Sequence, residues 1–156
     1  MVTIDNTVPV AAQGLLGSHS WSHTVGAGAD RLLIVELGFL SSIGSLILDV
    51  SYGAQPMTAL VGTQQLAGIW YLLNPAVGTA TVVVTWDAAD EKGVVGGSVS
   101  FFGVHQSVTF GVTVSAIGTD AAPTVAVAGT GHNSRVFGGL GVNHAATNTL
   151  TKTIGD

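Results

Sequence analysis

Histidines are the first residues to consider for chemistry, because imidazole nitrogens are common ligands of zinc and copper. His19 and His23 lie four residues apart in the segment HSWSHTV, and three more follow later in the chain: His105, His132 and His144. In an extended strand, residues four apart are separated by about 13 Å, which is too far for them to share one metal ion. The spacing therefore favours structural or surface histidines, and we predict no metal site from them.

Acidic residues supply a calcium candidate in the segment DAADEK, where Asp87, Asp90 and Glu91 cluster. Loops of this kind often provide oxygen ligands for Ca²⁺, but the alternating Asp-x-Asp-x-Asp-Gly pattern of a dedicated calcium loop is missing. A solvated turn is therefore the preferred interpretation. A glycosidase would need two carboxylates that face each other across a cleft, and nothing in the sequence places any two of Glu36, Asp49 and Glu91 in that way.

Nucleophiles and phosphate-binding loops are not marked by any motif. The chain has no cysteine, which excludes thiolate zinc sites, cysteine nucleophiles and disulfides. No Gly-x-Ser-x-Gly elbow surrounds Ser18, Ser98 or Ser100. The glycine-rich stretches GAGAD, GTGHNS and GGLG lack the P-loop pattern and are interpreted as turns. We therefore expect a protein without catalytic residues, cofactors or a metal centre.

Aromatic side chains carry one ligand-binding hypothesis. The rings of Trp21, Trp70 and Tyr71 would stack on sugar rings if they lay exposed on a concave sheet. In a β-sandwich, such rings more often fill the core. Carbohydrate binding is therefore the alternative function, and it depends on the exposure of these rings.

The composition predicts a folded protein with an unusually neutral surface. Only 8% of the 156 residues are charged, 47% are hydrophobic and 22 are glycine, whereas about a quarter of the residues in a typical domain are charged. The four basic residues are spread along the chain, so nucleic-acid binding is not expected. No apolar stretch is long enough to cross a membrane. The first residues, MVTIDNTVPVAAQ, do not resemble a secretory signal, so we expect a chain that is used without such export or whose signal was removed.

Alternating and apolar segments predict an all-β protein of about ten short strands, with the spacing of a sandwich or barrel. The segment 19–25 alternates like a half-buried strand, whereas 31–40 is apolar on both faces and is expected in the centre of a sheet. Because Pro9 withholds a backbone donor, the segment 2–12 suits an edge strand or an extended arm. Further strands are predicted at 45–52, 56–61, 94–104, 108–115, 123–128 and 135–142.

The stretch LAGIWYLLNPAVGTATVVVTW, residues 66–86, organises the predicted fold. Its β-branched and aromatic residues predict two long strands, and Asn74 and Pro75 followed by Gly78 predict a hairpin turn between them. We expect the core between the two sheets to contain Trp70, Val82, Val84, Trp86, Leu33, Val35, Val99 and Phe101.

Four segments together resemble a β-sandwich module that recurs in bacterial surface proteins and in structural proteins of tailed phages: WSHTVGAGADRLLIVEL, VSYGAQPMTAL, IWYLLNPAVGTATVVVTW and VSFFGV. The resemblance covers residues 21–142. It depends on strand and turn residues, so it implies a two-sheet antiparallel β-sandwich with a jelly-roll-like fold, and no catalytic residues can be carried over from it.

The two ends of the chain are predicted to work between subunits. Residues 1–18 are expected to form an N-terminal arm or edge strand, residues 19–142 the β-sandwich domain and residues 143–156 a C-terminal extended segment. The unpaired edge of a sandwich is normally covered or used for strand addition, and a neighbouring subunit could cover it. The predicted assembly residues are Val2, Ile4, Val8, Val10, Leu150 and Ile154.

These observations predict a non-enzymatic structural protein of an extracellular assembly. The expected location is a phage virion, with the chain as a head-decoration or tail-associated protein held by β contacts between subunits. Its expected partners are further copies of itself and other structural proteins of the same particle. The alternative is a carbohydrate-binding or adhesin module of a secreted bacterial surface protein, located outside the cell or on its surface, with a glycan as its partner.

Overall fold

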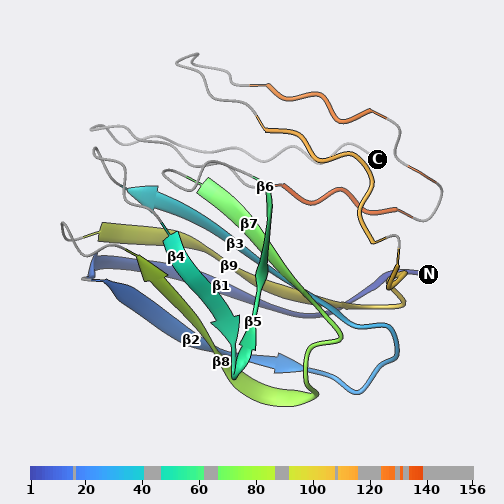
Figure 1. Cartoon of the computed structure of the whole chain (residues 1–156), viewed down its shortest axis with the longest axis horizontal. Helices are drawn as coiled ribbons and strands as arrows, with labels where there is room; N and C mark the ends of the chain where they lie inside the picture. Colours follow the sequence, from blue (N-terminus) through green and yellow to red (C-terminus); the bar gives the residue numbers. More distant parts are fainter. Residues whose placement is uncertain are drawn as a thin grey trace.

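The computed structural model describes residues 1–15, 17–40, 47–61, 67–86, 92–107, 109–115, 124–128, 131 and 134–138. Within these residues, every regular element is a β-strand (Figure 1). The strands are β1 (Thr3–Leu15), β2 (Ser18–Val25), β3 (Leu32–Leu40), β4 (Ile47–Tyr52), β5 (Gln55–Pro56), β6 (Thr58–Val61), β7 (Ala67–Leu73), β8 (Gly78–Trp86) and β9 (Lys92–Phe102).

The strands form two antiparallel sheets packed face to face, which confirms the predicted all-β sandwich. One sheet has five strands in the order β1-β9-β3-β7-β6, and the other has four in the order β2-β8-β4-β5. The chain alternates between the sheets, except that β4 and β5, and likewise β6 and β7, follow each other in one sheet: β1, β3, β6, β7 and β9 belong to the first sheet, and β2, β4, β5 and β8 to the second. This alternation is the connectivity of a jelly roll. The twice-apolar strand β3 lies in the middle of its sheet, and β1, which contains Pro9, lies at the edge.

The predicted hairpin over residues 66–86 is wrong, because its two strands belong to different sheets. β7 pairs with β3 and β6, whereas β8 pairs with β2 and β4. The turn between them, with Asn74 at a φ of 48°, carries the chain from one sheet to the other. Both strands are apolar at their inward positions, so each can occupy the interior of a sheet and face the other across the core.

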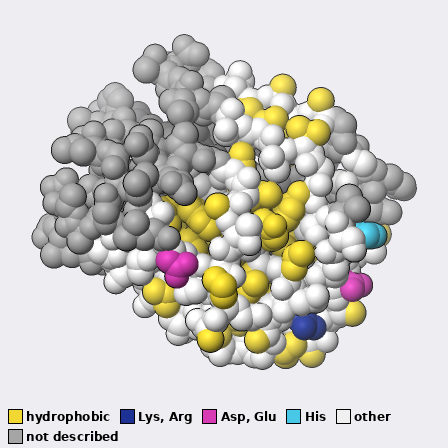
Figure 2. Space-filling model, viewed as in Figure 1, with side chains coloured by type: hydrophobic (Ala, Val, Ile, Leu, Met, Phe, Trp, Pro, Cys, Tyr) yellow, Lys and Arg dark blue, Asp and Glu magenta, His cyan; other side chains and the backbone are white. Residues whose placement is uncertain are grey.

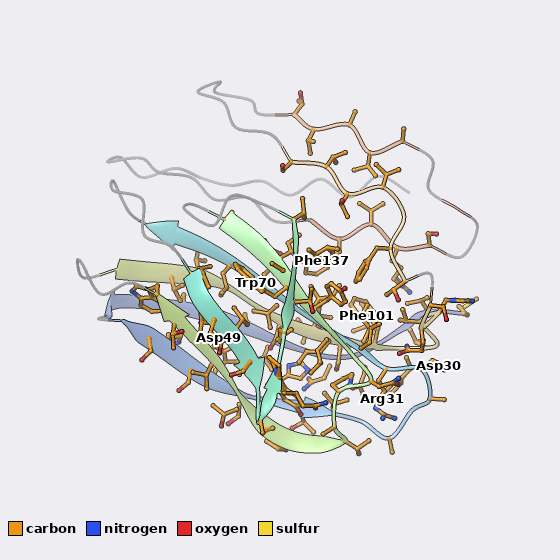
Figure 3. All side chains as sticks on the ribbon, in the orientation of Figure 1. Asp30, Arg31, Asp49, Trp70, Phe101 and Phe137 are labelled. Atoms are coloured by element: carbon orange, nitrogen blue, oxygen red, sulfur yellow. The ribbon has the colours of Figure 1, made fainter. Side chains whose placement is uncertain are left out.

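The guanidinium group of Arg31 holds this crossing in place at one end of the sandwich (Figure 3). Its Nε donates to the carbonyl of Pro75 at 2.9 Å, and its Nη1 donates to the carbonyl of Gly28 at 3.0 Å. The amide of Asn74 in turn donates to the carbonyl of Arg31 at 3.0 Å. One side chain thereby ties the β7–β8 connection to the β2–β3 connection.

The predicted strand 56–61 is divided between the two sheets. β5 pairs with β4 in the four-stranded sheet, and β6 pairs with β7 in the five-stranded sheet. Met57 lies between them, is buried in the core, and donates its backbone N–H to the carbonyl of Val50. Because the sheet changes within so short a segment, the sequence pattern predicted a single strand there.

The core between the sheets is built from inward side chains of both layers. Of the predicted core residues, Leu33, Val35, Trp70, Val82, Val84 and Trp86 are buried there. Val99 and Phe101 are also buried, but their predicted place between the sheets is wrong. They belong to a second apolar cluster with Leu32, Ile34 and Ile69 on the outer face of the five-stranded sheet.

Alternation along β9 explains this difference. Successive side chains of a strand point to opposite faces. Ser98 and Ser100 of β9 point inward and bond to side chains of the facing sheet, so Val99 and Phe101 must point outward. In this part of β9 the two serines therefore occupy the core side of the strand, and Val99 and Phe101 occupy the outer side.

Gly96 and Gly97 let β9 approach its two neighbours closely. A Cβ atom on Gly96 would overlap the carbonyl oxygen of Glu36 in β3, and one on Gly97 would overlap the carbonyl oxygen of Val8 in β1. Gly96 also has a φ of 148°, a backbone conformation that residues with a Cβ atom rarely adopt. The two glycines therefore allow close backbone packing on both sides of β9.

We expect Gly96→Ala to destabilise the protein by on the order of 3 kcal/mol, because the overlapping atom belongs to backbone that cannot move aside. Chemical denaturation measures the free energy of unfolding. Gly111→Ala is the matched control, since a Cβ atom there meets no atom within 4 Å. Equal stability of the two variants would contradict the close approach of β9 to β3.

Candidate functional site

The three aromatic residues of the sugar-binding hypothesis do not share one surface. Trp70 points into the core and is buried, while its neighbour Tyr71 points to the outer face and packs on Phe110 with ring centroids 4.6 Å apart. Trp21 lies in the other sheet, half-buried, with its indole N–H bonded to Ser98. In the described structure these rings form no common platform for a sugar.

The metal and acid candidates that the structure describes are also dispersed. Among the residues that the structure describes, no group of three His, Asp or Glu side chains could hold a metal ion. Glu36 lies in β3 of one sheet, and Asp49 is exposed in β4 of the other. Asp87, Asp90 and Glu91, the calcium candidates, lie outside the described residues, as do His132 and His144.

His19 and His105 occupy separate parts of the molecule. The ring of His19 stacks on Trp21 with centroids 5.9 Å apart. His105 is exposed after β9, where its Nδ1 accepts the backbone N–H of Ser107. Neither lies beside His23, whose two ring nitrogens are bonded to serine hydroxyls.

The predicted N-terminal assembly residues belong largely to the molecule's own sandwich. β1 pairs with β9 of the same chain along its length, so this strand is not an arm that crosses to a neighbour. Val10 points into the core, and Val2 packs against the outer apolar cluster. Ile4 is exposed and Val8 is half-buried. Leu150 and Ile154 lie outside the described residues.

The outer face of the five-stranded sheet is the first of two candidate sites. Its buried cluster consists of Leu32, Ile34, Ile69, Val99, Phe101 and Val104. The chain leaves β9 along the β2–β3 connection, where the amides of Gly103 and Val104 donate to the carbonyls of Ala29 and Asp30. It then passes over this face, and Phe110 packs against the cluster. Figure 1 shows the later segments continuing on that side of the sheet.

The sequence predicts strands at 108–115, 123–128 and 135–142, but the described segments in this part of the chain, 109–115, 124–128 and 134–138, form no strand in the structure. Arg135 connects the last of them to the N-terminus by donating from Nε to the carbonyl of Val2 at 3.3 Å. Five of their apolar side chains are more than a third exposed: Val112, Val125, Val127, Val136 and Phe137. In Figure 2, apolar side chains gather on the face seen in this view.

A buried chain of hydrogen bonds between the sheets is the second candidate site. His23 of β2 is only 1% exposed, and its ring lies between two buried hydroxyls of β9. Its Nδ1 lies 2.8 Å from Ser98 Oγ, and its Nε2 lies 3.0 Å from Ser100 Oγ. Trp21 Nε1 donates to Ser98 Oγ at 2.9 Å, and Ser100 Oγ donates to Asp5 Oδ2 at 2.7 Å.

The two ends of this chain fix its direction. An indole N–H can only donate and a carboxylate can only accept, so the two ends fix the roles of the Trp21 indole and of the Ser100 hydroxyl. Ser100 gives its proton to Asp5 and therefore accepts from His23 Nε2–H. Ser98 accepts from the indole and still holds its own proton, which it donates to His23 Nδ1 when the ring is neutral. In that neutral form the ring proton of His23 is on Nε2.

Burial supports this neutral form. Desolvation lowers the pKa of His23 below its ordinary value of 6.5, and the negative charge of Asp5 acts in the opposite direction. Asp5 Oδ2 also accepts the backbone N–H of Gly26 at 2.8 Å, which helps to satisfy the carboxylate. Each member of the chain from Trp21 to Asp5 therefore has a partner.

This arrangement differs from a catalytic triad. Ser98 and His23 have the contact of a nucleophile and its base, but Ser100 stands between His23 and the acid. His23, Ser98 and Ser100 are all buried. In the structure, these groups hold the two sheets together and present no hydroxyl to a substrate.

Sequence motifs could not reveal this chain of hydrogen bonds, because the residues that form it are distant along the sequence and follow no catalytic order. Alternation carries the signal that was available. It places Trp21 and His23 on one face of a strand, and it places Ser98 and Ser100 on one face of another. Polar residues that share the inward face of two strands in a sandwich can be expected to meet.

No protein-family model matches this chain, and no curated protein or solved structure matches it either. The resemblance to a surface or phage module therefore stays a prediction. In the part of the chain that the structure describes, no helix has the length and apolar character needed to cross a membrane.

We expect Ser98→Ala to lower the free energy of unfolding by about 1–3 kcal/mol, because it leaves Trp21 Nε1 and His23 Nδ1 without their partner in the interior. Thermal or chemical denaturation measures the change. Ser20→Ala, on the exposed side of β2, is the control and should change the stability by less than about 0.5 kcal/mol. If both variants are as stable as the wild type, the hydrogen bonds of Ser98 contribute nothing to stability.

Proposed function

We propose that the protein is a non-enzymatic structural subunit that assembles with further copies of itself through its C-terminal part. The observation that carries the proposal is a set of exposed apolar side chains on the described segments after β9, which form no strand: Val112, Val125, Val127, Val136 and Phe137. A single exposed valine is ordinary, but a group on neighbouring segments is typical of a surface that another protein covers.

The backbone of these segments supports the same proposal. The segments 109–115, 124–128 and 134–138 have no ladder partner among the described residues, and their sequences are rich in β-branched residues. Such segments can add to a neighbour through main-chain hydrogen bonds, while alternate side chains pack beneath them. A second copy of the chain supplies the same kind of segment and the same apolar side chains.

The charge of the molecule also favours association. With only four basic and nine acidic residues in the whole chain, a contact between copies has few charges to desolvate and little repulsion to overcome. The wild-type protein should therefore form an oligomer of defined size rather than a monomer.

Two acidic substitutions in the C-terminal segments should separate the copies. We expect Val125→Asp combined with Val136→Asp to convert the oligomer to a monomer, because carboxylates would be buried without partners in the contact. Light scattering coupled to gel filtration measures the molar mass, and circular dichroism verifies that the β structure persists.

The matched control for this experiment is Val77→Asp. Val77 and Val125 are both 54% exposed, but Val77 lies in the β7–β8 connection. The control should keep the wild-type oligomer. A wild-type protein that is monomeric at every concentration tested would overturn the proposal, and so would a control that dissociates like the double variant.

The finer proposal is that the assembly is a phage virion and that the chain is a head-decoration or tail-associated subunit. It is supported by the resemblance of four strand and turn segments to a module of tailed-phage and bacterial surface proteins, and by the neutral composition. Mass spectrometry of purified particles and of cell-surface fractions tests it. A virion subunit should be found in the particles, and a protein found only in the surface fraction would contradict this assignment.

A further inference from the structure

We propose that Asn6 and Pro9 close the β1 side of the sandwich to strand addition, so that a second copy of the chain cannot extend the five-stranded sheet at this edge. β1 is the end strand of that sheet and, among the described strands, it pairs only with β9. An end strand normally offers outward N–H and C=O groups on which another strand can add. The inference goes beyond the assembly proposed above and does not depend on it, because the groups that close the edge lie within one copy of the chain.

The orientation of Pro9 follows from the carbonyl group of the residue before it. A Cβ atom on Gly97 of β9 would overlap the carbonyl oxygen of Val8, so this oxygen points towards β9. In a trans peptide unit, the carbonyl oxygen and the substituent of the next nitrogen point to opposite sides. The ring of Pro9 therefore lies at the outward edge of β1, in the place where another residue would present an N–H.

The side chain of Asn6 removes a second outward donor. Backbone groups alternate along a strand, so the N–H of Thr7 points to the same edge as the nitrogen of Pro9. This N–H donates to Asn6 Oδ1 at 2.9 Å. An incoming antiparallel strand would have to bond to the alternate residues Thr7, Pro9 and Ala11, and the first two offer it no N–H.

The other half of the Asn6 amide engages the facing sheet. Asn6 Nδ2 donates at 3.0 Å to the carbonyl of Thr24 in β2, which is the end strand of the four-stranded sheet. Beside this bond, Asp5 Oδ2 accepts the backbone N–H of Gly26 at 2.8 Å. Figure 1 shows β1 and β2 along the same side of the sandwich. One amide side chain therefore occupies a backbone donor of one end strand and a backbone acceptor of the other.

The closed positions lie within the regular part of β1. The register with β9 shifts between Ile4 and Asn6 and again between Ala12 and Leu15, so it is uniform only over residues 6–12. Such irregularities themselves limit the pairing of an edge. The stretch that would otherwise serve as a template for a new strand is the one that contains Thr7 and Pro9.

Charge gives this edge little protection. β1 is rich in β-branched residues, which favour strand pairing, and Asp5 is its only charged residue. The carboxylate of Asp5 is bonded to Ser100 and to the backbone of Gly26. Since charged side chains are a usual means of protecting an edge, their scarcity in β1 leaves the closure to Asn6 and Pro9.

Opening the edge by substitution tests the proposal in the full-length protein. Asn6→Val combined with Pro9→Val frees one outward N–H and restores another, so the molar mass measured by light scattering should become at least about double that of the wild type at equal concentration. Because the comparison is with the wild type, it holds whichever oligomer the wild type forms. A double variant that keeps the wild-type molar mass and circular dichroism at every concentration tested would overturn the proposal.

Thr7→Val is the matched control, since it increases the β propensity of the same strand but leaves Asn6 and Pro9 in place. It should keep the wild-type molar mass, and a control that associates like the double variant would show that propensity, not closure, is the cause.

Hydrogen exchange measured by mass spectrometry locates the new contact. In the associated double variant, residues 6–12 should gain about tenfold protection relative to a dilute sample, whereas residues 78–86 of β8 should not change. Association without added protection of residues 6–12 would contradict the proposal, because the copies would then meet elsewhere.

Amide exchange followed by nuclear magnetic resonance tests the orientation of the edge even if the double variant does not fold. In dilute Pro9→Val, the introduced amide should exchange at about its intrinsic rate, whereas the amides of Val8 and Val10, which point towards β9, should stay protected. In Asn6→Ala, the Thr7 amide should lose about tenfold of its protection. A protected amide at position 9, or a Thr7 amide that does not respond to Asn6→Ala, would disprove the closure.

Discussion

The contact between the inward side chains of β8 and those of β3 and β7 is the interaction on which the rest of the fold depends. Val82 and Val84 of the four-stranded sheet meet Leu33 and Val35 of the five-stranded sheet in one buried cluster, with Trp70 and Trp86 as the largest members. Burial of these side chains supplies the main driving force for joining the two layers. Once the layers are joined, the buried hydrogen-bond chain lies between the two sheets, and the outer apolar cluster lies on the opposite face of the five-stranded sheet.

A polar chain inside a sandwich core carries a cost that an apolar core avoids. Each donor and acceptor must find a partner, because an unsatisfied group in the interior costs more than the hydrogen bond contributes. From Trp21 to Asp5 these requirements are met, and they are met only when β2 and β9 face each other in one alignment. We infer that the chain contributes to the uniqueness of the packing more than to its strength, as fully satisfied buried networks can do.

Local patterns predicted the strands well, but they could not predict how the strands are distributed between the sheets. Alternation and β-branched content identified the segments that became β2, β3, β4 and β9, and the doubly apolar pattern placed β3 in the middle. A turn such as the one at Asn74 and Pro75 has the same composition whether it returns a strand to its neighbour or carries it across the core. The choice depends on contacts with residues distant in the sequence.

The same limit applies to the candidate sites. Each residue of the buried chain looked ordinary by itself, and only the packing of β1, β2 and β9 brings Asp5, His23 and the two serines together. The aromatic residues illustrate the opposite case. Strand alternation already requires the adjacent Trp70 and Tyr71 to point to opposite faces, so a shared sugar platform could have been doubted from the sequence alone.

The glycine pair of β9 has a consequence for how the five-stranded sheet selects its pairing. If β9 slipped by one residue along its neighbours in one direction, Ser98 would take the place of Gly97; in the other direction, Val95 would take the place of Gly96. Either slip would drive a Cβ atom into a carbonyl oxygen of β1 or β3. Because the protein has so few charged residues, electrostatic repulsion can do little to disfavour wrong strand pairings. The two glycines disfavour them by steric overlap instead, in the strand that joins β1 to the rest of the sheet.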